Sequence, residues 1–259
     1  MLQVVDSVER WRAERARLDG AEIGFVPTMG ALHAGHAALL ERSLAENGTT
    51  VLSVFVNPTQ FDRDDDLARY PRTFDADRRL AEELGVDYLL CPPSAELYPD
   101  GYAYRVSESP FSRELEGAHR AGHFDGVLSV VLKLLNLVRP RRAYFGEKDF
   151  QQLELVRGMA AAFFLDAEIV GCPTVREADG LALSSRNRLL DPSDRERAGA
   201  FPRHLGSGAR PEEIVRRLED EGFRVDYVEE VRGRRCGAVH LGEVRLIDNF
   251  ALEDVGGRP

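Results

Sequence analysis

The sequence predicts an α/β protein in which a doubly wound parallel sheet is followed by a smaller α+β domain. Apolar runs that read as strands alternate with amphipathic helical patterns over most of the chain, and this alternation is typical of parallel sheets with helices on both faces. Residues 50–56 are almost continuously apolar, as expected for a strand buried on both sides. After about Pro173 arginine and glutamate become more frequent, which indicates a second, smaller domain.

The expected elements of the larger domain alternate between strand and helix. The first strand leads into the turn 27–30, and the last apolar helix is expected to end before Pro140, because proline cannot continue a helix. The acidic stretch 62–67 is interpreted as a loop. Strands are expected at residues 22–26, 50–56, 86–90, 143–145 and 167–170, and helices at 36–46, 73–84, 125–138 and 149–162.

The smaller domain is expected to contain two amphipathic helices and two short strands. The predicted helices are residues 192–200 and 211–221, and the predicted strands are 224–229 and 244–247. The segment 206–211 is rich in glycine and reads as a flexible connection. We place the domain boundary so that the larger domain is 1–174 and the smaller one is 175–259.

Composition and charge limit the classes of function. The 259 residues carry a formal net charge of -10 at pH 7, which argues against a nucleic-acid-binding protein, because contacts to phosphate backbones need a basic face. The longest apolar stretch, 126–138, is interrupted by Lys133 and is too short to span a membrane. The charged N-terminal stretch does not resemble a secretory signal. The three cysteines lie far apart, so we expect reduced thiols in a cytoplasmic protein.

The strongest chemical signal is the segment 28–36, Thr-Met-Gly-Ala-Leu-His-Ala-Gly-His. It follows a predicted strand and opens a helix, where α/β proteins bind ligands and where free N–H groups favour an anion. His33 and His36 are three residues apart and can face the same point, while Gly35 leaves room for a base or a phosphate. Imidazoles placed there can donate to a phosphorus centre whose oxygens gain negative charge in the transition state.

A zinc site is the alternative interpretation of these histidines. Such a site needs a third protein ligand. The nearest candidates are His119 and His123, in a glycine-containing stretch that reads as loop. Each of these two lacks a comparable context and is interpreted as an ordinary structural histidine, and we expect no metal-ligand set in the protein.

Lys148 is the second candidate. Of the 34 basic residues only Lys133 and Lys148 are lysine, so both are candidates for positions that need a compact ammonium rather than a planar guanidinium. Lys148 lies where a strand again leads into a helix, and Gln152 four residues later shares its face. The ammonium can meet a phosphate while the amide binds a hydroxyl or carboxylate. Asp149 is either a helix cap or a ligand of ribose hydroxyls.

Two further segments supply polar groups. Pro58 keeps Asn57 extended after its strand, and we expect Gln60 to lie over the same sheet edge as the histidines. Ser184 and its neighbours Ser185 and Arg186 can bind a triphosphate, although a serine there can also be a simple helix cap. These segments offer donors to an anion and no Ser-His-Asp or Cys-His nucleophile, so they predict nucleotidyl transfer.

These segments resemble a known family. Residues 33–36 are similar to the HIGH element of class I aminoacyl-tRNA synthetases and related nucleotidyltransferases, and residues 183–186 to their KMSKS-type element. Within that superfamily the chain resembles the pantothenate synthetase family. The strings that carry the resemblance are 27–36, 56–61, 70–73, 122–127, 146–152 and 184–187, with 245–249 near the C-terminus.

The resemblance implies a Rossmann-like domain with a small C-terminal lid domain, usually in a homodimer, and a reaction in two steps. The pantoate carboxylate attacks the α-phosphorus of ATP and releases pyrophosphate. The amine of β-alanine then attacks the acyl-adenylate and releases AMP. Mg²⁺ is expected to be carried by the phosphates. About twenty residues of the family pattern are absent between Tyr227 and Gly237, so the C-terminal domain is expected to be shortened.

The resemblance also implies roles for single residues. His36 would be the proton donor with His33 beside it, and the remaining catalytic residues would be Lys148, Ser184, Ser185 and Arg186. Gln60 and Gln152 would bind pantoate, with Gln60 also near β-alanine, and Asn57 would contact substrate. The ATP site would be lined by Met29, Gly30, Ala31, Leu32, His33, Ala34, Gly35, His36, Gly146, Glu147, Lys148, Asp149, Val175, Leu183, Ser184, Ser185 and Arg186.

Two other functions remain open on the sequence. One is adenylyl transfer by another HxGH enzyme, of the nicotinamide or pantetheine type. The other is a non-catalytic nucleotide-binding or scaffold protein, which would keep the anion-binding segments without turnover.

Overall fold

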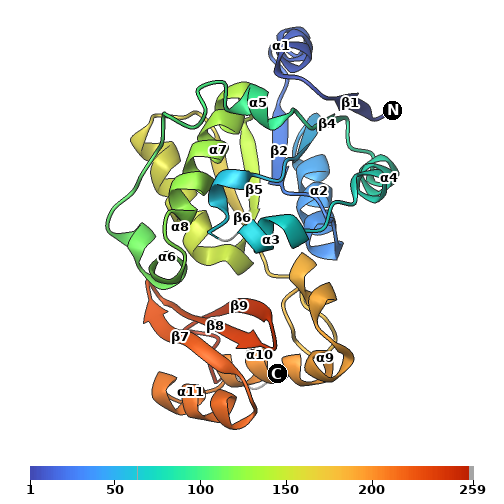
Figure 1. Ribbon diagram of the computed structural model, residues 1–259. Coiled ribbons are helices and arrows are strands. Elements are labelled where there is room, and N and C mark those ends of the chain that lie inside the picture. The colour runs from blue at the N-terminus through green and yellow to red at the C-terminus, as the bar shows by residue number, and fades with distance from the viewer. Residues whose placement is uncertain (63, 257–259) are drawn as a thin grey trace. The chain divides into compact units, whose positions relative to one another are not determined.

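The chain folds into two compact units in the computed structural model, which describes residues 1–62 and 64–256 (Figure 1). The N-terminal unit consists of residues 1–147 and 151–172. The C-terminal unit consists of Lys148–Phe150 and the chain from Pro173 onward. By its contacts the short segment around Lys148 therefore groups with the C-terminal unit. Arg63, in the predicted loop 62–67, lies outside the described residues.

The N-terminal unit is built on a parallel sheet of six strands in the order β1-β4-β3-β2-β5-β6. From β2 the chain proceeds outward through β3 and β4 on one side, and β5 and β6 extend the sheet on the other side. This order confirms the predicted doubly wound α/β fold. The strands are β1 (Gln3–Val5), β2 (Ile23–Thr28), β3 (Thr49–Val54), β4 (Tyr88–Leu90), β5 (Arg142–Gly146) and β6 (Glu168–Cys172).

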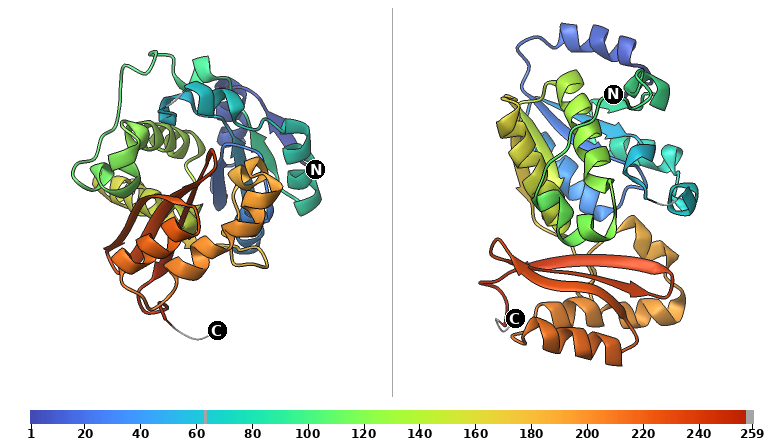
Figure 2. Two further views of the ribbon diagram at one scale, coloured as in Figure 1. Left: turned by 60° about the horizontal axis from the view of Figure 1, so that its bottom comes forward. Right: turned by 60° about the vertical axis from the view of Figure 1, so that its left-hand side comes forward.

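Helices cover both faces of this sheet (Figure 2). A Cβ on Gly24 of β2 would lie 2.2 Å from the Ser43 hydroxyl of α2, so α2 packs closely on the face to which Gly24 points. Gly171 of β6 points to the opposite face, where its Cβ would lie 3.0 Å from Leu153 of α8. The helices are α1 (Val8–Arg17), α2 (Ala34–Glu46), α3 (Asp64–Arg69), α4 (Phe74–Leu84), α5 (Ser94–Leu97), α6 (Leu115–His119), α7 (His123–Val138) and α8 (Phe150–Ala162), with short 3₁₀ turns η1 (Pro58–Gln60), η2 (Phe111–Arg113) and η3 (Glu147–Asp149).

The C-terminal unit is a three-stranded antiparallel sheet with helices. Its strands β7 (Arg224–Val231), β8 (Arg234–Leu241) and β9 (Val244–Ala251) pair in sequence order. One face buries Val239 and Leu246 against Phe201 and Leu205 of α10 and Leu218 of α11. The other elements are η4 (Ser185–Leu189), α9 (Pro192–Ala198), α10 (Ala200–Leu205) and α11 (Pro211–Asp220).

Strands β7 and β8 are joined by a tight hairpin, in the segment where the C-terminal domain was expected to be shortened. Only Arg232 and Gly233 connect β7 to β8, and their φ angles are 48° and 78°. Two successive residues with positive φ are typical of the type I′ turn, whose twist matches that of paired strands. The segment between Tyr227 and Gly237 is therefore continuous antiparallel sheet closed by the shortest common hairpin loop.

Two segments predicted to be loops contain helices, and several elements were not predicted. Residues 64–69 form the helix α3 rather than a loop, and the stretch that contains His119 and His123 is largely helical, because His119 ends α6 and His123 begins α7. Strand β8 was not predicted, since its sequence Arg-Arg-Cys-Gly-Ala-Val-His-Leu begins with two charges and lacks a clean alternation. The first strand and helix, β1 and α1, were also missed.

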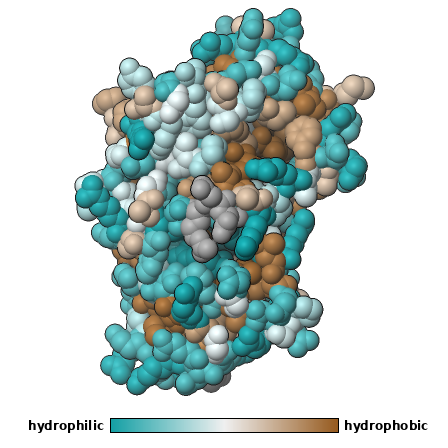
Figure 3. Space-filling model, viewed as in Figure 1, coloured by the Kyte–Doolittle hydropathy of each residue, from teal (hydrophilic) through white to brown (hydrophobic). Residues whose placement is uncertain are grey.

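The exposed surface of some helices is polar, in keeping with the acidic composition of the chain. Hydrophilic side chains predominate over α1 and α11 in the view of Figure 3. Trp11 is the buried residue of α1, and its indole N–H donates to the carbonyl of Leu137 at 2.8 Å. A helix that buries so little apolar surface gives only a weak periodic signal, which explains why α1 escaped prediction.

Candidate active site

The loop after β2 has a left-handed backbone conformation at two residues, and position 30 requires glycine. Gly30 and Ala31 have φ angles of 80° and 51°. The N–H of Gly30 donates to the Thr28 hydroxyl at 3.1 Å, and that hydroxyl donates to the carbonyl of Ser53 at 2.8 Å. A Cβ on Gly30 would lie 2.8 Å from the carboxylate of Asp77. The loop is thus fixed both by the adjacent strand and by a carboxylate from α4.

The two histidines of the HxGH segment lie side by side. His33 is the N-cap of α2, and its Nδ1 accepts from the N–H of Gly35 at 3.1 Å. In the neutral form of His33 the proton is therefore on Nε2. The ring centroids of His33 and His36 are 4.1 Å apart, with 37° between the planes. Their spacing in sequence predicted this pairing.

Asp77 of α4 binds this loop and is a site residue that sequence reasoning missed. Its side chain accepts from the N–H groups of Ala31 at 3.0 Å and Leu32 at 2.8 Å, and from the Thr73 hydroxyl at 3.1 Å. Asp77 is only 2% exposed. The sequence suggested that N–H groups here are open to an anion. Those of Ala31 and Leu32 already bind a carboxylate of the chain itself, so ligand phosphates must find other donors.

Gln60 lies in η1, shortly after the end of β3, and its side chain contacts the loop after β2. Its Nε2 lies 3.2 Å from the sulfur of Met29, and its Oε1 accepts from Nδ2 of Asn57 at 2.9 Å. Gln60 therefore lies at the sheet edge where it was expected, beside a residue of the predicted nucleotide loop.

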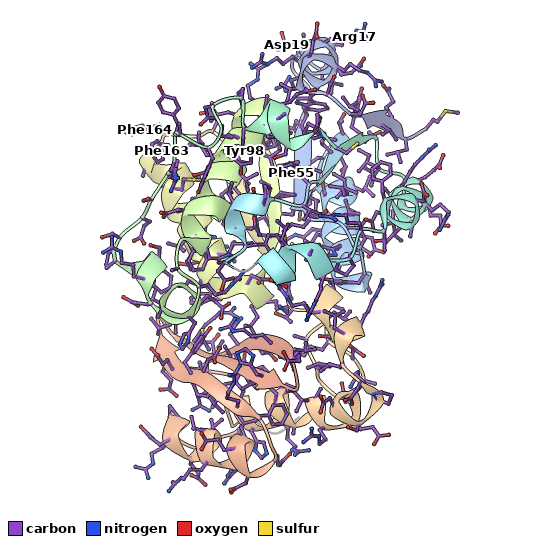
Figure 4. All side chains as sticks on the ribbon, in the orientation of Figure 1. Arg17, Asp19, Phe55, Tyr98, Phe163 and Phe164 are labelled. Atoms are coloured by element: carbon purple, nitrogen blue, oxygen red, sulfur yellow. The ribbon has the colours of Figure 1, made fainter. Side chains whose placement is uncertain are left out.

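Asn57 is buried, with 1% exposure, and holds Gln60 in place. Its Oδ1 accepts from the hydroxyls of Thr59 at 2.9 Å and Tyr98 at 2.7 Å, and its Nδ2 also donates to the carbonyl of Gly126 at 3.2 Å. Burial raises the pKa of Tyr98 to about 12, so this phenol stays a donor at neutral pH. Figure 4 labels Tyr98 and Phe55, whose ring centroids are 6.3 Å apart.

Arg120 and His123 hold the backbone of Gln60. The Gln60 carbonyl accepts from Nδ1 of His123 at 2.8 Å and from Nη2 of Arg120 at 3.3 Å. Nη1 of Arg120 lies 3.1 Å from Nε2 of His123. Because a guanidinium only donates, Nε2 accepts and the proton of His123 is on Nδ1. In the part of the chain that the structure describes, no three His, Cys, Asp or Glu side chains gather as metal ligands.

Gly126 sets the distance between α7 and the turn that carries Gln60. A Cβ there would lie 2.3 Å from the carbonyl oxygen of Thr59. We expect Gly126→Ala to lower the free energy of unfolding by about 1–3 kcal/mol, because backbone has to move to admit the methyl group. The control is Gly158→Ala in α8, where a Cβ meets nothing within 4 Å. Urea unfolding checks both, and equal stability of the two variants would contradict the close packing.

The end of β5 lies beside β2 at the point where the strand order reverses. Ligands of doubly wound sheets bind at the carboxyl ends of the strands at such a point, and Gly146 and Glu147 occupy it. In the helix that follows, Gln151 is buried, accepts from the N–H of Glu116 at 3.0 Å and donates to the carbonyl of Phe111 at 2.7 Å. The neighbouring Gln152 is half-buried. The two glutamines therefore differ, since Gln151 anchors a loop of the chain.

In the C-terminal unit, the predicted residues Val175 and Leu183 pair across a hairpin, and Ser184, Ser185 and Arg186 follow it at the start of η4. The N–H of Leu183 donates to the carbonyl of Val175 at 3.0 Å, and Arg176 pairs with Ala182. Ser184 is the N-cap of η4, and its hydroxyl accepts from the N–H of Arg186 at 3.2 Å. Ser185 is buried. The capping role proposed as an alternative for the serine is thus present in Ser184.

Lys148 is held to strand β9 of the same unit. Its carbonyl accepts from Nδ2 of Asn249 at 2.9 Å, and its ammonium lies 3.9 Å from the carboxylate of Asp149. The side chain of Lys148 is 17% exposed and that of Asp149 is 47% exposed. The predicted site residues thus form two groups: 28–36, 57–60, 146–147 and Gln152 belong to the N-terminal unit, and 148–149, Val175 and 183–186 to the C-terminal unit.

Comparison with known proteins gives a consistent family. Residues 1–251 match the family model described as pantoate-beta-alanine ligase. A pantothenate synthetase from Bdellovibrio bacteriovorus is 53% identical over 252 residues, covering 97% of this chain and 100% of that protein. One from Legionella pneumophila is 52% identical with the same coverage. Because the match covers the whole Bdellovibrio protein, the compact C-terminal domain is shared with that relative.

Solved structures agree with the sequence comparisons. The crystal structure described as pantoate-beta-alanine ligase from Francisella tularensis complexed with beta-gamma ATP and beta-alanine has a TM-score of 0.95 and 38% identity, covering 99% of this chain and 100% of that one. The pantothenate synthetase from Thermus thermophilus has a TM-score of 0.88 and 45% identity, with coverages of 96% and 99%. Within the described residues, every helix is too short or too polar to cross a membrane. On these similarities over its whole length, the chain belongs to the pantoate-beta-alanine ligase family.

Proposed function

We propose that this chain condenses (R)-pantoate with β-alanine at the expense of ATP. A carboxylate oxygen of pantoate forms a bond to the α-phosphorus, and the bond from that phosphorus to the bridging oxygen breaks, so that pyrophosphate leaves with its electron pair. The neutral amine of β-alanine then attacks the pantoyl carbonyl. AMP leaves, and the amide nitrogen loses a proton.

The N-terminal unit would bind pantoate and the nucleotide. Both His33 and His36 would donate hydrogen bonds to phosphate oxygens as negative charge develops on them, with His36 as the proton donor. Gln60 and Gln152 would bind pantoate, because an amide binds hydroxyl and carboxylate without a full countercharge that would weaken the nucleophile. Asn57, which is almost fully buried, would act by fixing the amide of Gln60.

The C-terminal unit would bind the phosphates and close over them. Lys148, Ser184, Ser185 and Arg186 would carry the phosphate contacts, and Mg²⁺ would be held by the phosphates of ATP. We propose that residues 175–259 act as a lid on the domain 1–174. We also propose that the enzyme is a cytoplasmic homodimer, on the resemblance described above.

One contact supports this function most directly, that between Met29 and Gln60. It joins the predicted nucleotide loop and the predicted pantoate amide within one unit, with Nε2 of Gln60 3.2 Å from the Met29 sulfur. An acyl-adenylate forms only when the carboxylate lies within about 3–3.5 Å of the phosphorus. Neighbouring binding groups for the two substrates are therefore what the first step requires.

The function is tested with ATP, pantoate and β-alanine, and with AMP and pyrophosphate as the measured products. We expect equal amounts of both, and about one pyrophosphate per active site when β-alanine is left out, since the mixed anhydride stays in a site that excludes water. Absence of turnover with these three substrates would overturn the proposal. Adenylyl transfer to nicotinamide mononucleotide or phosphopantetheine would support the other HxGH enzymes, and ATP binding without pyrophosphate release would support a scaffold.

His36→Ala is expected to lower the rate of pyrophosphate release by about 10²–10³-fold, the usual cost of losing one donor to a charged transition state. Because the substitution lies in the first turn of α2 and leaves its N-cap intact, ATP binding should persist. Single-turnover measurement with ATP and pantoate checks the rate. A variant that keeps the wild-type rate would remove His36 from the mechanism.

A further inference from the structure

Two successive residues of β9 connect the two phosphate-binding segments of the C-terminal unit. Asp248 and Asn249 are each 3% exposed and point to opposite sides of the strand. Asn249 donates to the Lys148 carbonyl at 2.9 Å and accepts from Nη1 of Arg234 at 2.5 Å. Its N–H donates to Oδ1 of Asp248 at 2.8 Å. Asn249 thus fixes the backbone from which the Lys148 ammonium extends.

On the other side of β9, Asp248 holds the hairpin that leads to Ser184. Its two oxygens accept from Nη1 of Arg176 at 2.6 Å and Nη2 at 3.0 Å, which is a bidentate pair. Burial raises the pKa of Asp248, and the hydrogen bonds and charge of Arg176 oppose that rise. Arg176 pairs in the hairpin with Ala182, two residues before Ser184.

We infer that Arg176, Asp248 and Asn249 are positioning residues for ATP, which hold Lys148 and the turn 183–186 at a fixed separation. The inference rests on the proposed function, in which those two segments bind the phosphates. Lysine is a compact charge on a flexible stem, so its reach is defined only if its backbone is fixed. A displacement of about 1 Å at a reacting centre can cost about 100-fold in rate.

If Asp248 and Asn249 only stabilised the fold, their substitution would have a different effect, and a carboxylate in the same sheet serves as the control. Asp226 of β7 accepts from Nε of Arg245 at 2.8 Å and lies 3.1 Å from Nε2 of His240. Asp226 is a carboxylate paired with an arginine, as Asp248 is, but it contacts Arg245 and His240 rather than Lys148 or the hairpin 175–183. Asp226→Asn therefore reports the general cost of neutralising such a carboxylate in this sheet.

The experiment compares Asn249→Ala, Asp248→Asn and Asp226→Asn in the full-length protein. For each, the thermal midpoint, the rate of pyrophosphate release, and KM for ATP and for β-alanine are measured. We expect Asn249→Ala and Asp248→Asn to lower kcat/KM for ATP at least about ten-fold while KM for β-alanine stays unchanged. Asp226→Asn should lower the thermal midpoint without changing KM for ATP. A loss of folded protein alone would lower kcat and leave every KM unchanged.

The outcomes separate this inference from the proposed function. If the wild type releases no pyrophosphate from ATP and pantoate, the proposed function fails and the inference with it. If the wild type is active and Lys148→Met is not, but folded Asn249→Ala keeps the wild-type kcat/KM for ATP, the inference alone is overturned. Should Asp248→Asn fail to fold, Asn249→Ala still decides, because it removes one side-chain amide and leaves the Arg176–Asp248 pair intact.

Discussion

Replacing Lys148 by arginine is expected to lower the rate of adenylate formation by about 10²–10³-fold, as does loss of a single donor to a charged transition state. The positive charge is kept, so the loss comes from geometry. Asn249 holds the backbone of Lys148 in place. From this fixed backbone, the longer, planar guanidinium of arginine cannot occupy the position of the compact ammonium. The side chain of Lys148 is only 17% exposed, so there is little space around it for the larger guanidinium group.

The other lysine is the matched control. Lys133 pairs with the carboxylate of Asp100 at 3.2 Å, and its ammonium lies 5.1 Å from the centre of the Tyr98 ring. Arginine can make both kinds of contact, so Lys133→Arg should keep near-normal activity. Single-turnover release of pyrophosphate measures both variants. If Lys148→Arg retains near-normal turnover, the scarcity of lysine in this chain carries no information about its site.

The parts of the site that sequence could predict are those determined within a few residues. The pairing of His33 with His36 follows from their spacing at the start of a helix, and the position of Gln60 follows from Pro58 at the end of a strand. The doubly wound order was predicted for a similar reason, because strand and helix alternate visibly along the chain. Each of these features has its cause inside one short segment.

The parts that sequence could not predict depend on partners far away in the chain. Asp77 binds the loop at Ala31 and Leu32 from 46 and 45 residues away, and Asn249 binds Lys148 from 101 residues away. In sequence Asp77 is one more acid in a charged helix. The segment 122–127, Gly-His-Phe-x-Gly-Val, was identified by resemblance, but its residues are explained by tertiary contacts. His123 binds the carbonyl of Gln60, and the absence of a side chain at Gly126 allows the backbone of Thr59 to approach closely.

The second large effect is expected from Asp77→Asn. The carboxylate receives the N–H of Ala31 on Oδ2, and the N–H of Leu32 and the Thr73 hydroxyl on Oδ1. An asparagine has the same shape but only one oxygen, so its NH₂ group must face an N–H donor on one side. A buried donor left without an acceptor costs about 1–3 kcal/mol, and the replaced hydrogen bonds were to a charged group, which are stronger.

The loss of these hydrogen bonds in Asp77→Asn should lower the catalytic activity as well as the stability. The two backbone N–H groups belong to the segment with positive φ at Gly30 and Ala31, a conformation that costs energy for a non-glycine residue and persists only when its surroundings enforce it. Without the carboxylate, the segment can relax and carry the N-cap His33 with it. We expect kcat/KM for ATP to fall by about 10–100-fold, since misplaced catalytic groups cost rate in that range.

Two further variants locate the cause. Asp75 is exposed in the first turn of the same helix, so Asp75→Asn removes the same charge near the same helix terminus and should leave turnover unchanged. Thr73→Val removes one of the hydrogen bonds to Asp77 but keeps the carboxylate, and should give a smaller loss in the same direction. Urea unfolding and pyrophosphate release are measured on all three. If Asp75→Asn lowers turnover as much as Asp77→Asn, the effect is electrostatic and general, and the buried carboxylate does not shape the histidine loop.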